Sequence, residues 1–567
     1  MADSINFGTL TTSGSGVRLT GTSSKLDTES LVRAAYEAKR LPAVRLEAKI
    51  AENDARLAAF GELRGLLEDL RSAVNGLRNP PGLLGRGENL FEAKRAYLAG
   101  GGGIDPASIL GVSLDNSAAT GGFEVEVERL ATAHKIRARS AASVTQTLAD
   151  AWNGGTGFTG TVELGLAGGA KASIDVDGDM TLADLAAAIN ARSSETGVAA
   201  NLVRVADGDV RLVLSAREAG KAIELADTGI DPVVPLLDPT ELVAAQTARI
   251  RIDGITVERT GNRIDDVLPG VVLDLYEARP GATVSVTIEN DLARIKERIG
   301  AFVDAWNALR DFLGKHSQVS AEGEVGSDAV LFGDRTLREI MRALAAEVSG
   351  RAFGLDDGAL GTLREVGVTM VEGGRLRIDE AKLDRMLLTR LEEVRRVFEF
   401  RAVTSSTELA VLGRSNSFAG SSFEVAIVDS DNDGVPESAT IGGVAATIAG
   451  RRIIGPAGSA FAGLEFAWVG TGTTTITVEV SQGIADRLHN LLGDALAPGN
   501  GPLARAVGEL GQTNTNYREE IEKINERAEK ARAALVEKLT RMETALSLAN
   551  TLLSQVRAQM DAMAGSR

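Results

Sequence analysis

Two long stretches with the periodicity of an amphipathic helix lie at opposite ends of a 567-residue chain. In both stretches the apolar residues follow alternating steps of four and three residues, which places them on one helix face as in a coiled-coil seam. The seam residues are Leu46, Ile50, Leu57 and Phe60 in the first stretch, and Tyr517, Ile521, Ile524, Leu535, Met542, Leu552 and Val556 in the second. Because neither stretch can bury its apolar face alone, we expect the two chain ends to pack in one helical domain.

The second stretch is the more regular of the two. About fifty residues at about 1.5 Å per residue predict a rod of about 75 Å. Its seam includes two polar positions, Asn514 and Lys538, so it is expected to form a weak zipper by itself and to pack better against another helix. Periodicity alone leaves a second interpretation equally open, which is an internal helical hairpin with no further role.

The first stretch carries signals for its start and its end. Asp27 is a good N-cap residue, and Glu29 in the first turn interacts favourably with the helix dipole. Pro42 is expected to interrupt the helix, because proline removes a backbone donor and crowds the preceding turn. The helix then covers residues 43–78 and ends at the sequence NPPG. Residues 1–42 are therefore predicted to be a flexible terminal segment.

Between the two helical ends the sequence alternates between strand-like and helical segments. Phe123, Val125 and Val127 alternate with polar residues, which is typical of a half-buried strand. Residues 291–400 return to helical periodicity, and residues 405–480 are again rich in strand signals. The predicted fold class is therefore α+β and multidomain, with β-rich domains inserted between helical segments that share one core.

Composition excludes several classes of protein. The net charge is −17, which argues against nucleic acid as the main partner because phosphate binding needs a basic surface. The chain has no cysteine, so disulfides, thiol nucleophiles and cysteine-bound metal centres are excluded. It has no run of about 18 apolar residues and no basic, apolar N-terminal region, so we expect neither a membrane span nor a cleaved secretory signal. A cytosolic protein and one exported without a cleaved signal both stay open.

The sequence shows no recognisable catalytic constellation. The three histidines, His134, His316 and His489, are scattered and lack the spacing of a metal-binding helix. No glycine-rich phosphate loop with the required lysine spacing is present either. We therefore predict no catalytic residues and no bound cofactor, and an enzyme is the less expected class.

The sequence DSDNDGVPE is the sharpest local motif. Asp429, Asp431 and Asp433 occupy positions 1, 3 and 5 of a calcium-binding loop, and Gly434 follows at position 6. Position 12 is not the usual glutamate, but Glu437 at position 9 could replace it. The loop therefore predicts a calcium site formed by the three aspartates and Glu437. A plain acidic turn between strands explains the same residues nearly as well.

Several stretches, taken in order along the chain, resemble one family. They are GTSSKLDTESLV at 21–32, VERLATAHKIRARS at 127–140, LFGDRTLREI at 331–340, LREVGVTMVEGGRLRIDEAKLDRML at 363–387 and GIADRLHNLL at 483–492. Together they resemble the bacterial flagellar filament-capping proteins, also called hook-associated protein 2. Lys25 stands where this family usually has glycine, and Arg129 stands where it usually has glutamine. The stretch TLADLAAAINARSSETGVAANLV resembles a repeat of flagellins and hook-associated proteins.

The resemblance implies that the chain is divided into a helical leg and β-rich head domains. The leg domain comprises the helix at 43–78, the helical segment 290–402 and the C-terminal helices at 481–567. The head domains are an inner one at 79–134 and 236–289 and an outer one at 135–235, which holds the flagellin-like repeat. Residues 403–480 are the least typical of the family and form an additional β-rich domain.

The resemblance also implies a function. Proteins of this family form an oligomeric plate at the distal tip of the flagellar filament, with legs that promote flagellin polymerisation and prevent flagellin loss. The implied partners are further copies of the chain, flagellin, hook-associated junction proteins and a type III export chaperone, without nucleic acid or a membrane span. The implied location is extracellular, reached through the flagellar type III system without a cleaved signal.

Three other functions are compatible with the sequence. One is a surface adhesin that displays β-modules on a coiled-coil stalk, and glycan or mucin binding would favour it. Another is a neighbouring junction protein of the same hook-associated group. The third, a secreted hydrolase with helical linkers, lacks any recognisable site.

Overall fold

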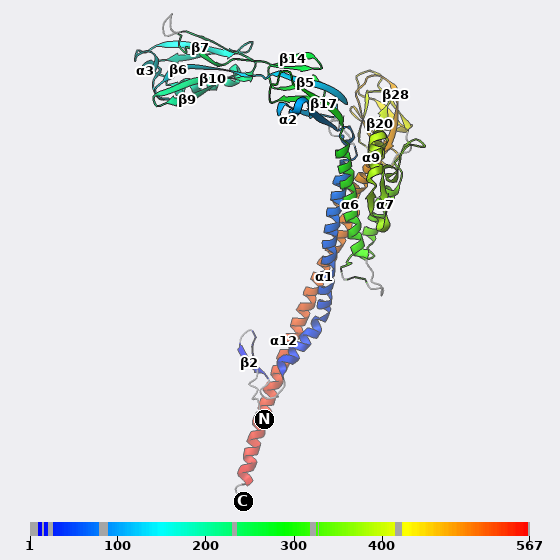
Figure 1. Cartoon of the computed structure of the whole chain (residues 1–567). Helices are drawn as coiled ribbons and strands as arrows, with labels where there is room; N and C mark the ends of the chain where they lie inside the picture. Colours follow the sequence, from blue (N-terminus) through cyan, green and yellow to red (C-terminus); the bar gives the residue numbers. More distant parts are fainter. Residues whose placement is uncertain are drawn as a thin grey trace. The chain divides into compact units, whose positions relative to one another are not determined.

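The computed structural model of the chain describes residues 9–13, 16–20, 27–78, 89–228, 235–317, 325–326, 328–413 and 422–564. The chain divides into two compact units, one made of Met1–Arg78 with Arg298–Arg567 and the other of Asn79–Glu297. Figure 1 colours the chain from its N-terminus to its C-terminus. The first unit contains both ends of the chain, so the expected helical domain built from both ends is confirmed.

The first unit contains the long helices. Its main helices are α1 (Thr28–Asn75), most of α6 (Leu292–Ser317), α7 (Arg335–Ser349), α8 (Leu363–Val366), α9 (Glu380–Thr389), α10 (Leu391–Phe398), α11 (Ile484–Leu496) and α12 (Pro502–Ala564). Val74 of α1 lines one small cavity together with Phe302 of α6 and Phe398 of α10, so these helices share a core. Among the described residues, none of the helices is long and apolar enough to cross a membrane.

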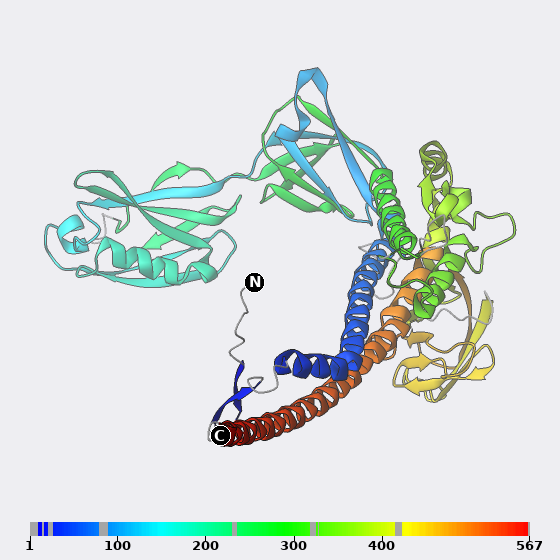
Figure 2. The same cartoon turned by 90° about the horizontal axis from the view of Figure 1, so that it is seen from below.

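Helix α1 corrects the expected interruption at Pro42. The helix is continuous over 48 residues with Pro42 inside it, and it begins at the predicted cap, where the Asp27 carboxylate accepts a hydrogen bond from the Ser30 amide at 3.0 Å. A proline in a long helix costs one backbone hydrogen bond and bends the axis without having to end it. The first turns of α1, dark blue in Figure 2, run at an angle to the rest of the helix.

The predicted flexible segment 1–42 is only partly described. Residues 1–8, 14–15 and 21–26 lie outside the described residues. The described part consists of a two-stranded antiparallel ribbon, β1 (Thr9–Ser13) and β2 (Gly16–Thr20), and of the first turns of α1. The bounds of this segment stay a prediction.

A short hairpin is attached to helix α6 by side-chain hydrogen bonds. The hairpin pairs β18 (Val368–Met370) with β19 (Leu376–Ile378). Trp306 of α6 donates its indole N–H to the Gly374 carbonyl at 2.9 Å. The side chain of Asn307 donates to the carbonyl of Leu376 at 2.9 Å and accepts from its amide at 2.8 Å. Polar side chains that satisfy the hairpin's main chain thus fix it on the helix.

The first unit also contains two sheets that share one apolar core. One sheet has the order β20 (Phe400–Thr404), β28 (Thr474–Gln482), β22 (Ser422–Val428), β23 (Ser438–Ile441) and β24 (Val444–Ala445). The other has the order β21 (Leu409–Gly413), β27 (Glu465–Trp468), β26 (Arg452–Ile454) and β25 (Thr447–Ala449). Val425, Phe466 and Trp468 are among the buried residues between them.

The second unit, Asn79–Glu297, contains two further sheet pairs. In the first pair, β14 (Ile255–Arg259), β13 (Ala248–Ile252), β5 (Gly121–Arg129), β17 (Thr283–Asn290) and β3 (Lys94–Gly100) face β15 (Arg263–Leu268), β16 (Val271–Leu275) and β4 (Leu110–Leu114), which follows helix α2 (Pro106–Ile109). Val125 and Val127 of β5 are buried in the core between them. The predicted alternation of strand 123–127 is therefore confirmed.

The second sheet pair of this unit has its own core. One sheet has the order β12 (Thr240–Val243), β6 (Ala133–Ala141), β10 (Asp209–Ala219) and β9 (Val198–Ala206), and the other β11 (Ile223–Asp227), β7 (Thr159–Leu166) and β8 (Lys171–Asp177). Three helices accompany them, α3 (Leu148–Trp152), α4 (Leu182–Ala191) and α5 (Ser193–Thr196). Leu185 and Ile189 of α4 reach the core. The fold is α+β, with β-rich parts inserted between helical segments, as predicted.

Candidate assembly surface

Helices α1 and α12 lie side by side and run antiparallel (Figure 1). Residue numbers rise along α1 as they fall along α12 in the polar contacts between them. These contacts include Arg532 over the Tyr36 ring, Arg40 with Asn525 at 2.9 Å, Lys49 over the Tyr517 ring, and Asn53 with Asn514 at 2.8 Å. The register is thus fixed by contacts spread along the helix pair.

Asn514 is the polar centre of this helix pair. Its side chain is only 2% exposed. Its carbonyl oxygen accepts a hydrogen bond from Asn53 at 2.8 Å, and its amide group donates to the Asp54 carboxylate at 2.7 Å. A buried amide that is satisfied in one alignment penalises every shifted alignment, which makes Asn514 a determinant of register. Lys538, the other polar residue of the predicted seam, is exposed.

The predicted seam residues fall into three groups by exposure. Phe60 is buried in the helical core of the first unit. Most of the others are half-buried between α1 and α12: Leu46, Ile50, Leu57, Tyr517, Ile521, Ile524 and Leu535. Met542, just past the start of α1, is also half-buried. Leu552 and Val556 are exposed. Half-burial is expected for two helices without a third neighbour, because the partner helix shields only part of each seam side chain and leaves the rest in contact with solvent.

Helix α12 extends past the first residue of α1 (Figures 1 and 2). Thr28 at the start of α1 lines the same groove as Leu539 of α12, so roughly the last seven turns of α12 have no α1 residue opposite them. This projecting end carries a row of apolar side chains that are 51–65% exposed: Leu548, Leu552, Leu553, Val556 and Met560. A continuous exposed apolar row of this kind is typical of a protein–protein interface.

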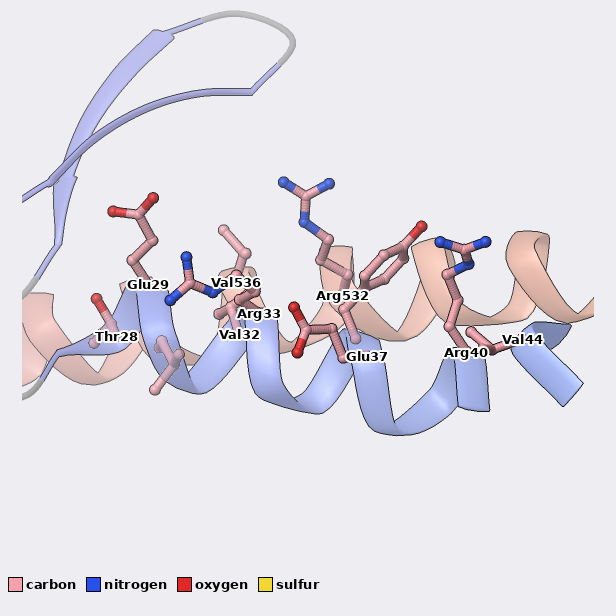
Figure 3. A pocket seen from close by; sticks show the side chains of 11 residues that line it. Thr28, Glu29, Val32, Arg33, Glu37, Arg40, Val44, Arg532 and Val536 are labelled. Atoms are coloured by element: carbon pink, nitrogen blue, oxygen red, sulfur yellow. The ribbon is translucent and has the colours of Figure 1, made fainter. Parts of the chain in front are cut away.

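A groove of about 510 Å³ lies where α1 begins against α12 (Figure 3). Its apolar lining includes Val32, Val536 and Leu539. Glu29, Arg40 and Arg532 extend from the helix pair on one side in Figure 3, so charged groups flank the apolar floor. The groove leads from the covered part of α12 to its projecting end and belongs to the same candidate surface.

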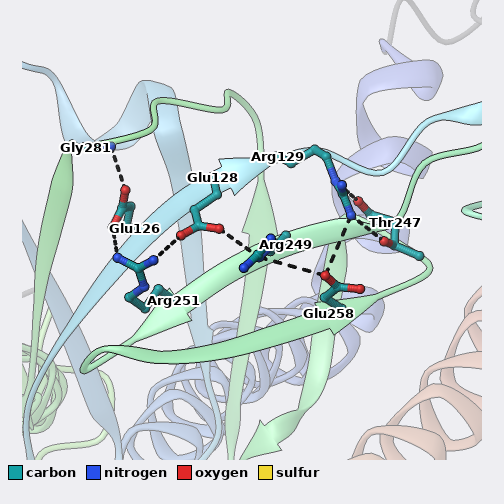
Figure 4. Close-up of polar contacts among 8 residues, drawn as sticks. All are labelled: Glu126, Glu128, Arg129, Thr247, Arg249, Arg251, Glu258 and Gly281. Carbon is teal, nitrogen blue, oxygen red and sulfur yellow. Dashed lines mark hydrogen bonds and ion pairs between the residues drawn. The ribbon is translucent and has the colours of Figure 1, made fainter.

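A second polar cluster, on the strands β5, β13 and β14, contrasts with this surface (Figure 4). Arg251 forms ion pairs with Glu126 at 3.3 Å and with Glu128 at 2.6 Å. Arg249 pairs with Glu128 at 2.9 Å. The remaining Glu126 oxygen accepts a hydrogen bond from the Gly281 amide at 2.6 Å. Because these charges compensate one another within the sheet, the cluster stabilises the strand pairing and offers little to a ligand.

The predicted calcium-loop residues separate into two groups. Asp429, Asp431 and Asp433 each place a carboxylate oxygen within 4.8 Å of the others. Glu437 is not part of that cluster, and both of its carboxylate oxygens accept hydrogen bonds from the Ser430 amide, at 2.9 and 3.0 Å. The loop therefore brings three of the four predicted ligands together.

Sequence reasoning missed part of the apolar row on α12. It identified Leu552 and Val556 as seam residues but not Leu548, Leu553 and Met560. A signal was present, because residues 548, 552, 556 and 560 follow four-residue steps on one helix face. A coiled-coil seam alternates steps of four and three residues, so a search for that spacing does not find a row with steps of four.

Comparisons with known proteins agree with these features. Residues 24–134 match the family model for the N-terminus of flagellar hook-associated protein 2, and residues 245–551 match the model for its C-terminus. Residues 163–218, in the second sheet pair, match the flagellin hook IN motif. The A-type flagellar hook-associated protein 2 of Pseudomonas aeruginosa is 25% identical over 409 residues, which cover 67% of this chain and 80% of that protein.

Two other similar proteins have the same kind of name. Flagellar hook-associated protein 2 of Salmonella typhimurium is 31% identical over 225 residues, covering 37% of this chain and 47% of that protein. The crystal structure of the D1-D2-D3 domains of the flagellar cap protein FliD from Escherichia coli is 21% identical with a TM-score of 0.46, covering 60% of this chain and 89% of that one. Since the C-terminal family model alone spans residues 245–551, the chain belongs to the flagellar hook-associated protein 2 family.

Proposed function

We propose that this chain caps the distal tip of the bacterial flagellar filament through the projecting end of α12. Membership of the flagellar hook-associated protein 2 family makes the filament cap its function, and the role is structural. The observation that carries the proposal for α12 is its exposed apolar row, from Leu548 to Met560. In our proposal this row packs against helices of neighbouring subunits in the assembled cap and filament.

The proposed partners are further copies of the chain and flagellin. When an amphipathic helix of a neighbour covers an apolar helix face that is exposed in the monomer, the complex is stabilised by about 25 cal/mol per Å² of apolar surface buried. Several copies are proposed to form a plate from the β-rich domains, with the helix pairs as legs. The chain is proposed to reach the filament tip through the flagellar type III system, with an export chaperone and with hook-associated junction proteins as neighbours.

The adhesin interpretation has no specific observation in its favour. The charged cluster on β5 and β13 is paired within its own sheet. The groove at the start of α1 is continuous with the apolar surface of the helix pair. We therefore propose one function, with the helix pair as its working surface.

The experiment uses a strain that lacks the gene and is complemented with variants. Leu552→Asp with Val556→Asp places two charges in the apolar row and should abolish motility, with flagellin monomers lost into the medium. The matched control is Ser547→Asp with Ser554→Asp, which adds the same charge to exposed positions on the opposite side of the same helix. The control should remain motile and form normal filaments in electron micrographs.

Both variants should fold like the parent, because all four positions are exposed. Circular dichroism of the purified chains checks this point. Normal motility and normal filament length with the Leu552→Asp, Val556→Asp variant would show that the projecting row does not serve assembly.

A further inference from the structure

The turn between β22 and β23 folds its acidic residues towards one point. Strand β22 ends at Val428 and strand β23 begins at Ser438. Within the turn, Asn432 has a φ of 61° and Gly434 a φ of 78°, both in the left-handed region. The positive φ favours glycine at position 434, and a Cβ atom there would also displace the Arg451 guanidinium, which lies 2.5 Å from that position. The resulting curvature gathers the carboxylates of Asp429, Asp431 and Asp433.

Asp429 is the buried member of this cluster. Its side chain is 1% exposed. Its Oδ2 atom accepts hydrogen bonds from the amides of Gly472 at 2.7 Å and Gly434 at 3.2 Å. Its Oδ1 atom is buried and has no hydrogen-bond partner among the described residues. A buried anionic oxygen without a donor is costly, so this atom indicates a cation as its natural partner.

The neighbouring groups leave the three carboxylates uncompensated. Asp431 and Asp433 accept hydrogen bonds from main-chain amides within the turn, at 3.2 and 2.7 Å. Arg451 approaches the turn, but its guanidinium donates to the main-chain carbonyl of Asp433 at 3.5 Å. Within the described part of the chain, no lysine or arginine forms an ion pair with any of the three carboxylates.

We propose that Asp429, Asp431 and Asp433 bind one calcium ion. Hard carboxylate oxygens suit Ca²⁺, whose ligands lie at 2.3–2.6 Å, so that ligands on opposite sides of the ion are up to about 5 Å apart. The three carboxylate oxygens, all within 4.8 Å of one another, fit that sphere. Mg²⁺ binds ligands at 2.0–2.1 Å, and its sphere is only about 4 Å across. Main-chain carbonyls and water complete the coordination in our proposal.

The bound ion links two segments of the β-sandwich in the first unit. Asp429 already contacts the segment before β28, through the Gly472 amide and through its own amide, which donates to the Thr473 hydroxyl at 3.2 Å. A cation on the free Oδ1 atom would hold the β22–β23 turn against that segment. Because Glu437 is not a ligand, the affinity should be that of extracellular calcium modules, with a Kd on the order of 10⁻⁴–10⁻³ M.

The test is isothermal titration of the full-length chain with CaCl₂ and, separately, with MgCl₂. We expect one calcium ion per chain with a Kd on the order of 10⁻⁴–10⁻³ M and at least tenfold weaker magnesium binding. Hydrogen exchange should become slower in peptides that contain Gly434 and Gly472 when calcium replaces EGTA. The thermal unfolding midpoint of the β-sandwich should rise by about 2–4 °C in millimolar calcium.

Two double variants with the same change in charge test whether calcium binds at this turn. Asp431→Asn with Asp433→Asn should abolish calcium binding and the changes in hydrogen exchange. Glu424→Gln with Glu479→Gln removes two exposed carboxylates from the same sheet and should bind calcium like the parent. Absence of binding at 10⁻² M calcium, on the order of ten times the expected Kd, would overturn the proposal. Calcium binding that survives in the Asp431→Asn, Asp433→Asn variant, or equally tight magnesium binding, would also overturn it.

Discussion

Residues 63–74 of α1 and residues 548–560 of α12 have similar apolar spacing but different surroundings. In α1 the residues that repeat along one face are fully buried under helices of the same unit: Leu63, Leu67, Leu70 and Val74. In α12 the corresponding row is more than half exposed. The two rows have the same chemical character, so the difference lies in whether the chain supplies its own cover.

This difference separates folding from assembly. The covered row contributes to the stability of the monomer, because its apolar surface is removed from water when the chain folds. The projecting row contributes almost nothing to the stability of the monomer. It stabilises an assembly only when another chain covers it. A sequence pattern thus identifies an apolar helix face, while the tertiary structure decides whether that face is a core or an interface.

The largest expected effect comes from truncating one residue in each row, which tests whether the two rows differ in their contribution to stability. Leu67→Ala should lower the free energy of unfolding of the full-length chain by about 2–5 kcal/mol, because it removes buried methyl groups and leaves a cavity. Leu552→Ala should change it by less than about 0.5 kcal/mol, because the side chain is exposed. Urea denaturation followed by circular dichroism at 222 nm measures both. Equal losses in the two variants would mean that the rows do not differ as described.

The sequence predicts the fold well where one periodicity dominates. The two helical ends, their shared domain and the alternating strand at 123–127 follow from spacing alone. The interruption at Pro42 was predicted wrongly, because a local rule about one missing hydrogen bond was applied to a helix of 48 residues. In such a helix the packing of α1 on α12 outweighs the penalty at a single position.

The candidate site is less predictable than the fold. Leu552 and Val556 could be identified as apolar helix positions, but their exposure depends on the register in which α1 meets α12. That register depends on contacts such as Asn53 with Asn514, which join residues far apart in the chain. The acidic loop shows the same limit, because spacing along the loop predicts Glu437 as a fourth ligand, whereas in the folded turn both of its carboxylate oxygens accept hydrogen bonds from the Ser430 amide.

The second prediction concerns pH and belongs to the covered half of the helical unit. Burial, with the nearby charges of Arg78 and Arg71, lowers the pKa of His489 in α11 from 6.5 to about 4. Between pH 6.5 and 4, His489 is therefore protonated in the unfolded chain but neutral in the folded chain. The free energy of unfolding thus falls as the pH decreases from 6.5 towards 4. The free energy of unfolding should be lower at pH 5.0 than at pH 7.5 by about 2 kcal/mol from this residue alone.

His489→Gln isolates that contribution. The variant keeps a neutral polar side chain, so its stability should depend less on pH between 7.5 and 5.0 than that of the parent. Urea denaturation at the two pH values gives the comparison, and other titrating groups cancel in the difference between the two chains. A parent and a variant with the same pH dependence would rule out His489 as the buried neutral group.

The smallest expected change in stability concerns Asn514, which lies in the part of α12 that α1 covers. Asn514 sets the register of α12 on α1, and this register decides how much of α12 is covered. Asn514→Leu should change the free energy of unfolding by less than about 1 kcal/mol, because the gain from apolar burial offsets the lost hydrogen bonds to Asn53 and Asp54. Uniqueness of register should nevertheless be lost, since leucine fits several alignments of the seam equally well.

Spin labels can measure that loss directly, because the chain has no cysteine of its own. Labels at Arg45→Cys on α1 and Glu522→Cys on α12, both exposed positions, should give one narrow distance in the parent. In the Asn514→Leu background a second distance should appear, displaced by one heptad or about 10 Å. Asn516→Leu, at an exposed position of the same helix, should keep the single distance. If Asn514→Leu also keeps it, the half-buried apolar residues alone must fix the register, and with it the length of α12 that projects beyond α1.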